Sequence, residues 1–143
     1  MERNLTKDKG DKGLAYVIAD LTEKEYYICL PLAEHLPFDL VAVNNQGLMV
    51  RVQVKFRNVS RSGCIEVKFA STWSNRKGTH LKAHDFGAFD GYAVYCPETK
   101  LVYYIPSREM SGRTAIWLRV KEDVLLRSSM RFASGYTDPG VMF

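Results

Sequence analysis

Residues 48–57 read Leu-Met-Val-Arg-Val-Gln-Val-Lys-Phe-Arg, and the alternation in this stretch decides the fold. Apolar side chains stand at positions 50, 52, 54 and 56, and polar ones at 51, 53, 55 and 57. Successive side chains of a β-strand point to opposite faces of its sheet, so the pattern predicts a strand with one face in the core. The other face carries Arg51, Gln53, Lys55 and Arg57.

A hairpin joins this strand to the one before it. Residues 38–43 are a short apolar strand, and residues 44–47, Asn-Asn-Gln-Gly, form a cluster typical of a turn. A three-residue hairpin loop needs a left-handed residue, a conformation that Gly47 can adopt. With that loop Asn44 lies opposite Leu48, which sets the register of the whole hairpin.

The same register brings together three side chains that can perform chemistry. Asp39 lies opposite Gln53, with Cβ atoms about 5 Å apart as in any directly opposed pair. Lys55 is two residues further along the strand and shares that face. A carboxylate, an amide and an ammonium group therefore converge at one edge of the predicted sheet.

This combination suits phosphodiester hydrolysis. Asp39 can bind Mg²⁺ through hard oxygen, and Gln53 can offer its amide oxygen to the same ion. The metal would neutralise the phosphate and activate a water molecule, while Lys55 would hold the nucleophile or stabilise the developing charge. From the residues alone a plainer interpretation stays open, in which Asp39 belongs to a turn and Lys55 is a solvated strand lysine.

The rest of the chain reads as one helix followed by a mixed sheet, an α/β arrangement. After a polar lead-in at residues 1–9, a helix is predicted over residues 9–24, with an apolar stripe made of Leu14, Val17, Ile18 and Leu21. Residues 71–84 are polar and basic, and are expected to form a loop with a helical turn. Further strands are expected at residues 26–32, 64–69, 91–96, 101–105 and 114–120.

Length and composition are those of one ordinary globular domain. The chain has 143 residues, of which 46% are hydrophobic and 25% charged, so we expect a single domain over residues 1–143. Its three scattered cysteines fit neither a disulfide framework nor a zinc cluster. No apolar run nears the roughly 18 residues of a membrane span, and no secretory signal is seen, so we expect a cytoplasmic protein. A net charge of +4 favours an anionic partner.

Several of these residues form a recognisable motif. Pro37-Phe38-Asp39 followed by Gln53-Val54-Lys55 resembles the PD-(D/E)XK nuclease motif. Lys9-Gly10-Asp11-Lys12-Gly13 and the strand at residues 51–55 resemble, more narrowly, the group I intron-associated homing endonucleases of that superfamily. In that subgroup glutamine can occupy the usual acidic position. The resemblance extends from about residue 9 to residue 106.

The resemblance implies a PD-(D/E)XK, restriction endonuclease-like fold with an αβββαβ core and a mixed central sheet. It implies catalysis by Asp39, Gln53 and Lys55, with Mg²⁺ or Mn²⁺ held by Asp39 and Gln53, and hydrolysis of double-stranded DNA. It also implies a homo-oligomer, because the intron-associated members look like tetramers that recognise a long, partly palindromic site.

Two positions depart from the family pattern. Gln53 is neutral where many of these nucleases carry Asp or Glu, which should weaken metal binding. Leu14 follows Gly13 at the position where the first helix of the family usually carries a metal-binding glutamate. Leu14 also belongs to the apolar stripe of the predicted helix, and the plainer interpretation is that it packs in the core. The absence of a glutamate at position 14 leaves three alternatives. The chain is impaired in cleavage, or it uses Asp11, one turn earlier in the helix, as a metal ligand, or its sequence has been altered to stop cleavage.

Basic residues flank the predicted site and are expected to contact DNA phosphates: Arg57, Arg61, Arg76, Lys77 and Lys82. The alternative is a solvated basic surface. His80 and His84 have helical i, i+4 spacing but no third zinc ligand, so we expect them to be exposed or to contact phosphate. The four tyrosines at 92, 95, 103 and 104 are expected to belong to the sheet rather than to stack on bases.

Three functions stay open from the sequence. The first is a site-specific endonuclease of the intron-homing type, and the second is a Holliday-junction resolvase or restriction-like nuclease of the same fold. The third is a DNA-binding protein with a degenerate, inactive nuclease site, which Leu14 favours. Cleavage of junctions against linear duplexes separates the first two, and tight binding without cutting in Mg²⁺ or Mn²⁺ would identify the third.

Overall fold

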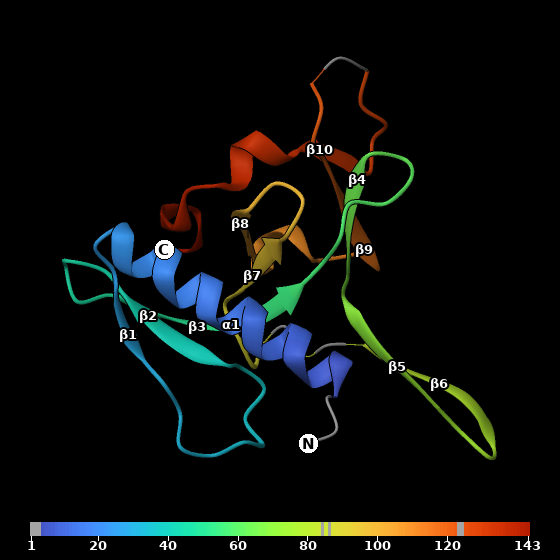
Figure 1. Ribbon diagram of the computed structural model, residues 1–143, viewed down its shortest axis with the longest axis horizontal. Helices are drawn as coiled ribbons and strands as arrows, with labels where there is room; N and C mark the ends of the chain where they lie inside the picture. The colour runs from blue at the N-terminus through green and yellow to red at the C-terminus, as the bar shows by residue number, and fades with distance from the viewer. Residues whose placement is uncertain (1–3, 84, 86, 123–124) are drawn as a thin grey trace.

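The computed structural model describes residues 4–83, 85, 87–122 and 125–143, except for the side chains of residues 71–75 and 80–83. Figure 1 shows its elements along the chain, in which η denotes a 3-10 helix. They are, in order, α1 (Leu5–Glu23), β1 (Tyr27–Cys29), β2 (Leu40–Val43), β3 (Met49–Phe56), β4 (Cys64–Lys68), β5 (Ala70–Asn75), β6 (Gly78–Ala83), β7 (Gly91–Cys96), β8 (Leu101–Pro106), η1 (Ser107–Glu109), β9 (Ala115–Arg119), β10 (Met130–Phe132), η2 (Ala133–Tyr136) and η3 (Pro139–Met142).

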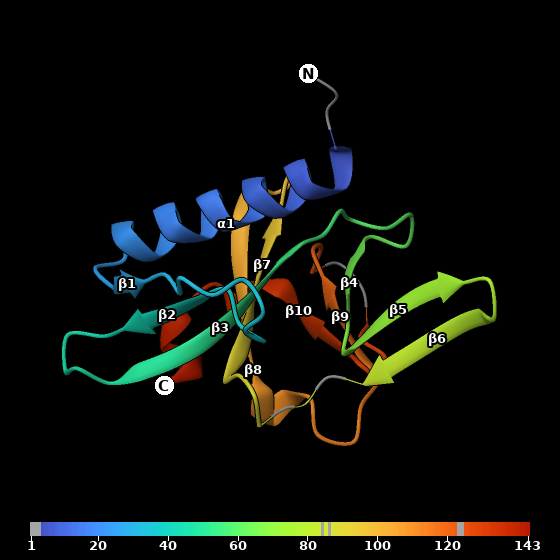
Figure 2. The same cartoon turned by 90° about the horizontal axis from the view of Figure 1, so that it is seen from below.

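The central layer is a five-stranded sheet with the order β1-β2-β3-β7-β8, and α1 runs across one of its faces (Figure 2). The buried residues on that face form the helix-side cluster: Val17, Leu21, Leu40, Ala42, Val50, Val52, Ala93, Tyr95, Val102, Tyr104 and Met142.

The three-stranded sheet β10-β9-β4 packs on the other face of the central sheet. There the sheet-side cluster comprises Ile65, Val67, Phe69, Phe89, Tyr92, Val94, Cys96, Tyr103, Ile105, Met110, Ile116, Leu118, Ala133 and Tyr136. All four tyrosines predicted to belong to the sheet are therefore in the core.

The central sheet is mixed, as the sequence predicts. β3 pairs with β7 in parallel, whereas the other neighbours in this sheet are antiparallel. A parallel pair needs a long crossover connection, which is usually a helix. Here β4, β5 and β6 make up that connection, and α1 is the one α-helix among the described residues. The second helix of the αβββαβ order is thus replaced by strands in this part of the chain.

The predicted hairpin register is confirmed. Leu40 pairs with Val52 across β2 and β3, and the backbone N–H of Asn44 donates to the carbonyl oxygen of Leu48 at 3.0 Å. Gly47 has a φ of 82°, the left-handed conformation that glycine adopts without steric cost. The turn therefore sets which residues of β2 and β3 face each other.

α1 begins at Leu5, four residues before the predicted start. The side chain of Asn4 caps it by accepting a hydrogen bond from the backbone N–H of Lys7 (3.2 Å), as N-cap asparagines do. The one apolar residue of the first turn, Leu5, is exposed, so this turn does not extend the apolar stripe on which the prediction rested. The predicted stripe does face the sheet: Val17 and Leu21 are buried, and Leu14 and Ile18 are half-buried.

The prediction for residues 71–84 is wrong. β5 and β6 form an antiparallel ribbon, with Asn75 opposite Gly78 around a two-residue loop. His80 lies in β6 and so has no helical relationship to His84, which lies outside the described residues. The sequence did not reveal these strands, because a ribbon that projects from the body (Figure 2) needs no continuous apolar face.

The last twenty residues, for which the sequence predicts no element, complete the core. β10 pairs in parallel with β9, and Met142 of η3 is buried in the helix-side cluster. The ring of Phe143 stacks on Tyr26, with centroids 5.5 Å apart. The tail therefore contributes to both sides of the central sheet: β10 and η2 lie on the side of the three-stranded sheet, and residues 141–143 pack on the same side as α1. Within the described ranges, no helix combines the length and apolar character that a bilayer crossing requires.

Candidate active site

Asp39 lies where the regular pairing of β2 with β3 ends. The ladder runs to Leu40, which is opposite Val52. One residue earlier, the backbone N–H of Asp39 donates to the carbonyl oxygen of Val52 (2.9 Å). Its carboxylate Oδ2 accepts the backbone N–H of Val54 at 2.6 Å. The carboxylate thus takes the role of the next acceptor in the ladder, at the point where the two strands separate.

This hydrogen bond ties Asp39 to the middle of the Gln53-Val54-Lys55 triplet. Leu40 is buried in the helix-side cluster, so strand alternation directs Asp39 to the opposite face, which also carries Gln53 and Lys55. Asp39 is exposed as a residue, but its carboxyl group sits against β3 and loses part of its hydration. That burial raises the pKa of Asp39, and the Val54 N–H and the Lys55 charge offset it only in part.

Gln53 presents a buried amide oxygen, Oε1, that accepts no hydrogen bond from the described residues. Leaving a buried polar atom unpaired costs about 1–3 kcal/mol. Hard cations take oxygen ligands, so an unpaired amide oxygen beside the Asp39 carboxylate fits a bound divalent ion.

Lys55 extends over the ring of Tyr92, with Nζ 4.7 Å from the ring centroid. Tyr92 is the β7 partner of Gln53 and is buried in the sheet-side cluster. Burial lowers the pKa of Lys55 to about 8, an effect that Arg57 reinforces and Asp39 opposes. The ammonium group is therefore poorly hydrated, which strengthens its attraction to an anionic oxygen.

Asp90 anchors the strand that carries these residues. Its carboxylate accepts the backbone N–H of Arg51 (2.7 Å), the Nε of the same residue (3.1 Å) and its Nη2 (2.9 Å). The bonds join the beginning of β7 to β3, two residues before Gln53. Sequence reasoning missed both Asp90 and the contact of Tyr92 with Lys55, because both depend on the parallel pairing of β3 with β7. The one local feature that could have pointed to Asp90 was its position directly before the strand predicted at residues 91–96.

The site offers one carboxylate and one amide oxygen. No three side chains of His, Cys, Asp or Glu gather into a metal-binding group within the residues that the structure describes. Asp39 and Gln53 therefore fit a divalent ion by the chemistry of their oxygens, with further coordination left to water and to phosphate oxygens.

Comparisons with known proteins identify the family of this chain. A family model described as PD-(D/E)XK endonuclease matches residues 4–138, which include Asp39, Gln53 and Lys55. The chain belongs to the PD-(D/E)XK endonuclease family. The solved structure of a bacterial homing endonuclease, I-Ssp6803I, is similar with a TM-score of 0.78 and 26% sequence identity over 93% of this chain and 88% of that one. No curated protein sequence gave a match. The family and fold class inferred from the sequence are thus confirmed.

In this PD-(D/E)XK endonuclease, Leu14 is a packing residue of the first helix. Its side chain is half-buried and contacts the helix-side cluster. Lys55 lies over Tyr92, which belongs to the cluster on the other face. Leu14 and Lys55 are thus on opposite faces of the central sheet, and the apolar stripe predicted from the sequence accounts for Leu14.

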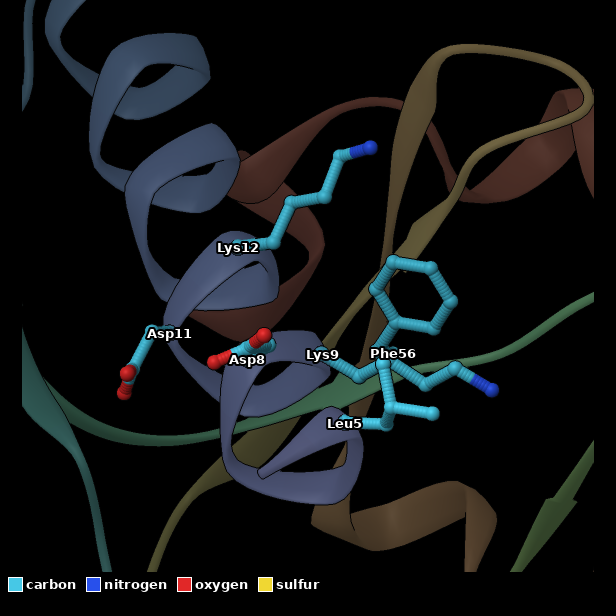
Figure 3. Close-up of a pocket in the computed structure, with 6 residues that line it drawn as sticks. All are labelled: Leu5, Asp8, Lys9, Asp11, Lys12 and Phe56. Atoms are coloured by element: carbon cyan, nitrogen blue, oxygen red, sulfur yellow. The ribbon is translucent and has the colours of Figure 1, made fainter. Parts of the chain in front are cut away.

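Asp11, the alternative ligand suggested by the sequence, lies on a different surface feature. A hollow of about 530 Å³ opens beside the first turns of α1 and is lined by Leu5, Asp8, Lys9, Asp11, Lys12 and Phe56 (Figure 3). The figure shows the Asp11 carboxylate directed away from the Phe56 ring. Phe56 packs against the helix-side cluster, so this hollow is on the face of the sheet opposite to Lys55. A role for Asp11 at the metal stays a prediction.

The five basic residues predicted to contact DNA lie in three places. Arg57 comes directly after the last residue of β3. It lines a hollow of about 330 Å³ together with Asn58, Ser60, Glu66 and Lys68. Arg61 is exposed in the turn before β4. Arg76 and Lys77 are exposed at the tip of the β5–β6 ribbon, and Lys82 lies in β6 with its side chain outside the described part.

Proposed function

We propose that this PD-(D/E)XK endonuclease is a site-specific enzyme of the intron-homing type, which hydrolyses phosphodiester bonds in duplex DNA with Mg²⁺ as its ion. The observation that carries the proposal is the hydrogen bond that holds the Asp39 carboxylate against the Gln53-Val54-Lys55 triplet. The similarity to I-Ssp6803I, a homing endonuclease, supports the choice of this class.

Asp39 and Gln53 would hold the ion through their carboxylate and amide oxygens. A divalent ion, when bound, neutralises phosphate charge and lowers the pKa of a water molecule. The Val54 N–H keeps the Asp39 carboxylate oriented toward the site. Lys55, poorly hydrated against Tyr92, would bind the attacking oxygen or the negative charge that develops on the phosphate. A single carboxylate implies modest affinity for the ion, because ligand charge sets the affinity of hard cations.

DNA would be held mainly through its phosphates. Half or more of protein–DNA hydrogen bonds go to the backbone rather than to bases, and the net charge of this chain is +4. The residues proposed for these contacts are Arg57, Arg61, Arg76, Lys77 and Lys82. Binding should weaken steeply as salt rises, since each phosphate contact releases counterions.

A second candidate is a DNA-binding protein whose nuclease site is impaired. Leu14 favours it, because an apolar residue occupies the position where the family resemblance implies a metal-binding glutamate. In this case the basic surface would function without cleavage. The two candidates agree on the partner, double-stranded DNA, and differ only in whether the bond is broken.

The deciding experiment offers the purified chain three substrates: linear duplexes that carry candidate intron-insertion sites, random linear duplexes and four-way junctions. Each is incubated with Mg²⁺, with Mn²⁺ and with EDTA. We expect cutting of the insertion-site duplexes at defined positions in Mg²⁺, and none in EDTA. Cutting confined to junctions would replace homing by a resolvase function. Tight binding without cutting in either metal would establish the second candidate.

We also propose that the working form is a homotetramer. One active site cuts one strand, so a double-strand break at a partly palindromic target requires at least two copies of the chain. A tetramer has four times the chain mass of 16.3 kDa, which light scattering of the free protein and of its DNA complex would detect. A monomer or a dimer in both states would refute this assembly.

A further inference from the structure

The β5–β6 ribbon, residues 70–83, stands away from the rest of the molecule in both views (Figures 1 and 2). Its two strands form a sheet of their own, and within the described residues no third strand pairs with either of them. The pairing runs from Ala70 opposite Ala83 to Asn75 opposite Gly78. A two-stranded hairpin is marginally stable by itself in water. An arm of this kind indicates a surface that is used in binding.

The charged residues of the ribbon are all basic. It contains Arg76, Lys77 and Lys82, whereas all 16 acidic residues of the protein lie outside it. Arg76 and Lys77 form the loop at the tip, and both are exposed there. A cationic arm without any carboxylate is suited to an anionic partner.

We propose that the β5–β6 ribbon enters the major groove of duplex DNA and reads base pairs beside the cleavage position. The proposal rests on the endonuclease function above and adds the element that would supply sequence specificity. Each strand has six residues, which corresponds to a length of about 20 Å. The major groove is roughly 12 Å wide and admits a two-stranded ribbon. The free outer edges of β5 and β6 would leave backbone N–H and C=O groups available to phosphates and bases.

The position of the ribbon along the chain connects it with the active site. β6 ends at Ala83, and the chain then reaches Asp90, whose carboxylate holds Arg51. Arg51 is two residues before Gln53 on β3. A ribbon seated in the groove would therefore be linked through a short segment to the strand that carries the catalytic triplet.

The competing partner is a second copy of this chain, joined through the open ribbon edges. That arrangement would bring two ribbons of the same positive charge together, and like charges on neighbouring strands are destabilising. DNA phosphates instead neutralise them. The charge of the ribbon therefore favours DNA over self-association.

The test uses a shortened ribbon, in which residues 73–80 are replaced by Asn-Gly so that Thr72 and Leu81 flank a tight hairpin turn. A milder variant carries Arg76→Ala with Lys77→Ala. The matched control carries Lys121→Ala with Arg127→Ala, which removes the same charge from exposed positions away from the ribbon. Each protein selects duplexes from a random-sequence pool, and the selected duplexes are probed by methylation interference at guanine N7, which lies in the major groove.

We expect N7 methylation to block binding of the full chain at specific base pairs. Shortening the ribbon should reduce the preference at those base pairs by about tenfold each. The Arg76 and Lys77 double variant should reduce the slope of log affinity against log salt by about 2, and the control should leave both the preference and the slope as they are.

Unchanged sequence preference in the shortened ribbon would overturn the proposal. The proposal would also be overturned if the shortened-ribbon variant lost oligomeric mass but kept its sequence preference. That result would assign the ribbon to contacts between copies of the chain. The Arg76 and Lys77 variant keeps the test open if the shortened chain fails to fold, because a salt slope equal to that of the control would also overturn the proposal. A full chain that neither binds nor cuts DNA would instead refute the proposed function itself.

Discussion

The carboxylate of Asp39 accepts the backbone N–H of Val54 at 2.6 Å, across the point where β2 leaves β3. One side chain thereby completes the backbone pairing and fixes its own orientation. The carboxylate is held beside the two neighbours of Val54, which are Gln53 and Lys55.

Asp39→Asn should abolish cleavage and leave DNA affinity within about tenfold of the original, because Lys and Arg contacts to phosphate supply most of the binding. The amide oxygen can still accept the Val54 N–H, so the fold should persist. Cleavage of duplex DNA and binding in the presence of EDTA measure the two effects. Glu34→Gln, at an exposed loop position, is the control. Normal cutting by Asp39→Asn would show that the active site lies elsewhere.

Lys55→Met should separate activity from stability. We expect cleavage to fall by about 100-fold or more, since a cation aimed at the reacting phosphate is lost. The free energy of unfolding should stay equal or rise by up to about 1 kcal/mol, because a poorly hydrated ammonium is replaced by an apolar chain of similar length. Lys68→Met, at an exposed position on β4, should change neither quantity strongly. Cleavage at the original rate would remove Lys55 from the mechanism.

Leu14→Glu tests the missing carboxylate of the first helix. Leu14 packs on the helix side of the sheet, whereas Lys55 lies over Tyr92 on the other side. A carboxylate at position 14 is therefore separated from the ion by the sheet, and we expect Mg²⁺ affinity and cleavage to stay close to those of the unmodified chain. The same change should lower stability without metal, since Leu14 packs on the helix-side cluster and a buried carboxylate is costly. Mg²⁺ titration of cleavage and of thermal unfolding follows both effects. A large gain in cleavage or in Mg²⁺ affinity would contradict the placement of Leu14 and would make position 14 a ligand position.

Asp90→Asn should destabilise the protein in a pH-dependent way. Its hydrogen bonds to Arg51 lower the pKa of Asp90, so the folded state favours the ionised carboxylate. This contribution is present above the ordinary pKa of about 4 and is lost as pH falls through the lowered pKa of the folded state. With these side chains 36% and 40% exposed, solvent screening limits it to about 1 kcal/mol. Urea unfolding at pH 7 and pH 3 should show a deficit that shrinks at the lower pH, and Asp11→Asn is the control.

Two glycines should respond to alanine in opposite directions. A Cβ atom at Gly91 would lie 2.8 Å from the carbonyl oxygen of Ile105 and 2.9 Å from Sδ of Met142, so Gly91→Ala should cost about 1–3 kcal/mol of stability. A Cβ atom at Gly10 would meet no atom within 4 Å. Since Gly10 is inside α1, Gly10→Ala should add about 1 kcal/mol. Thermal unfolding of the two variants measures the contrast, and equal effects would contradict the packing at Gly91.

Much of the site follows from local sequence. The alternation at 50, 52, 54 and 56 predicts β3, and Gly47 predicts a loop that brings Asp39 toward Gln53 and Lys55. Both features depend on residues that are neighbours in the chain, because the period of a strand and the geometry of a turn are local properties. The apolar stripe of α1 was predicted for the same reason.

Other features of the site were decided by the tertiary structure alone. The parallel pairing of β3 with β7 sets Lys55 over Tyr92 and brings Asp90 to Arg51, in each case across more than thirty residues of sequence. The lack of a hydrogen-bond partner for Oε1 of Gln53 among the described residues likewise depends on which side chains pack around it.

The β5–β6 ribbon could not be predicted from the pattern, since strands that project into solvent carry no apolar periodicity. The sequence by itself therefore determined the β2–β3 hairpin and the proposed site residues that converge on it. Their hydration, charge balance and anchoring arise only when distant strands pack, because burial is a property of the assembled layers and not of any one segment.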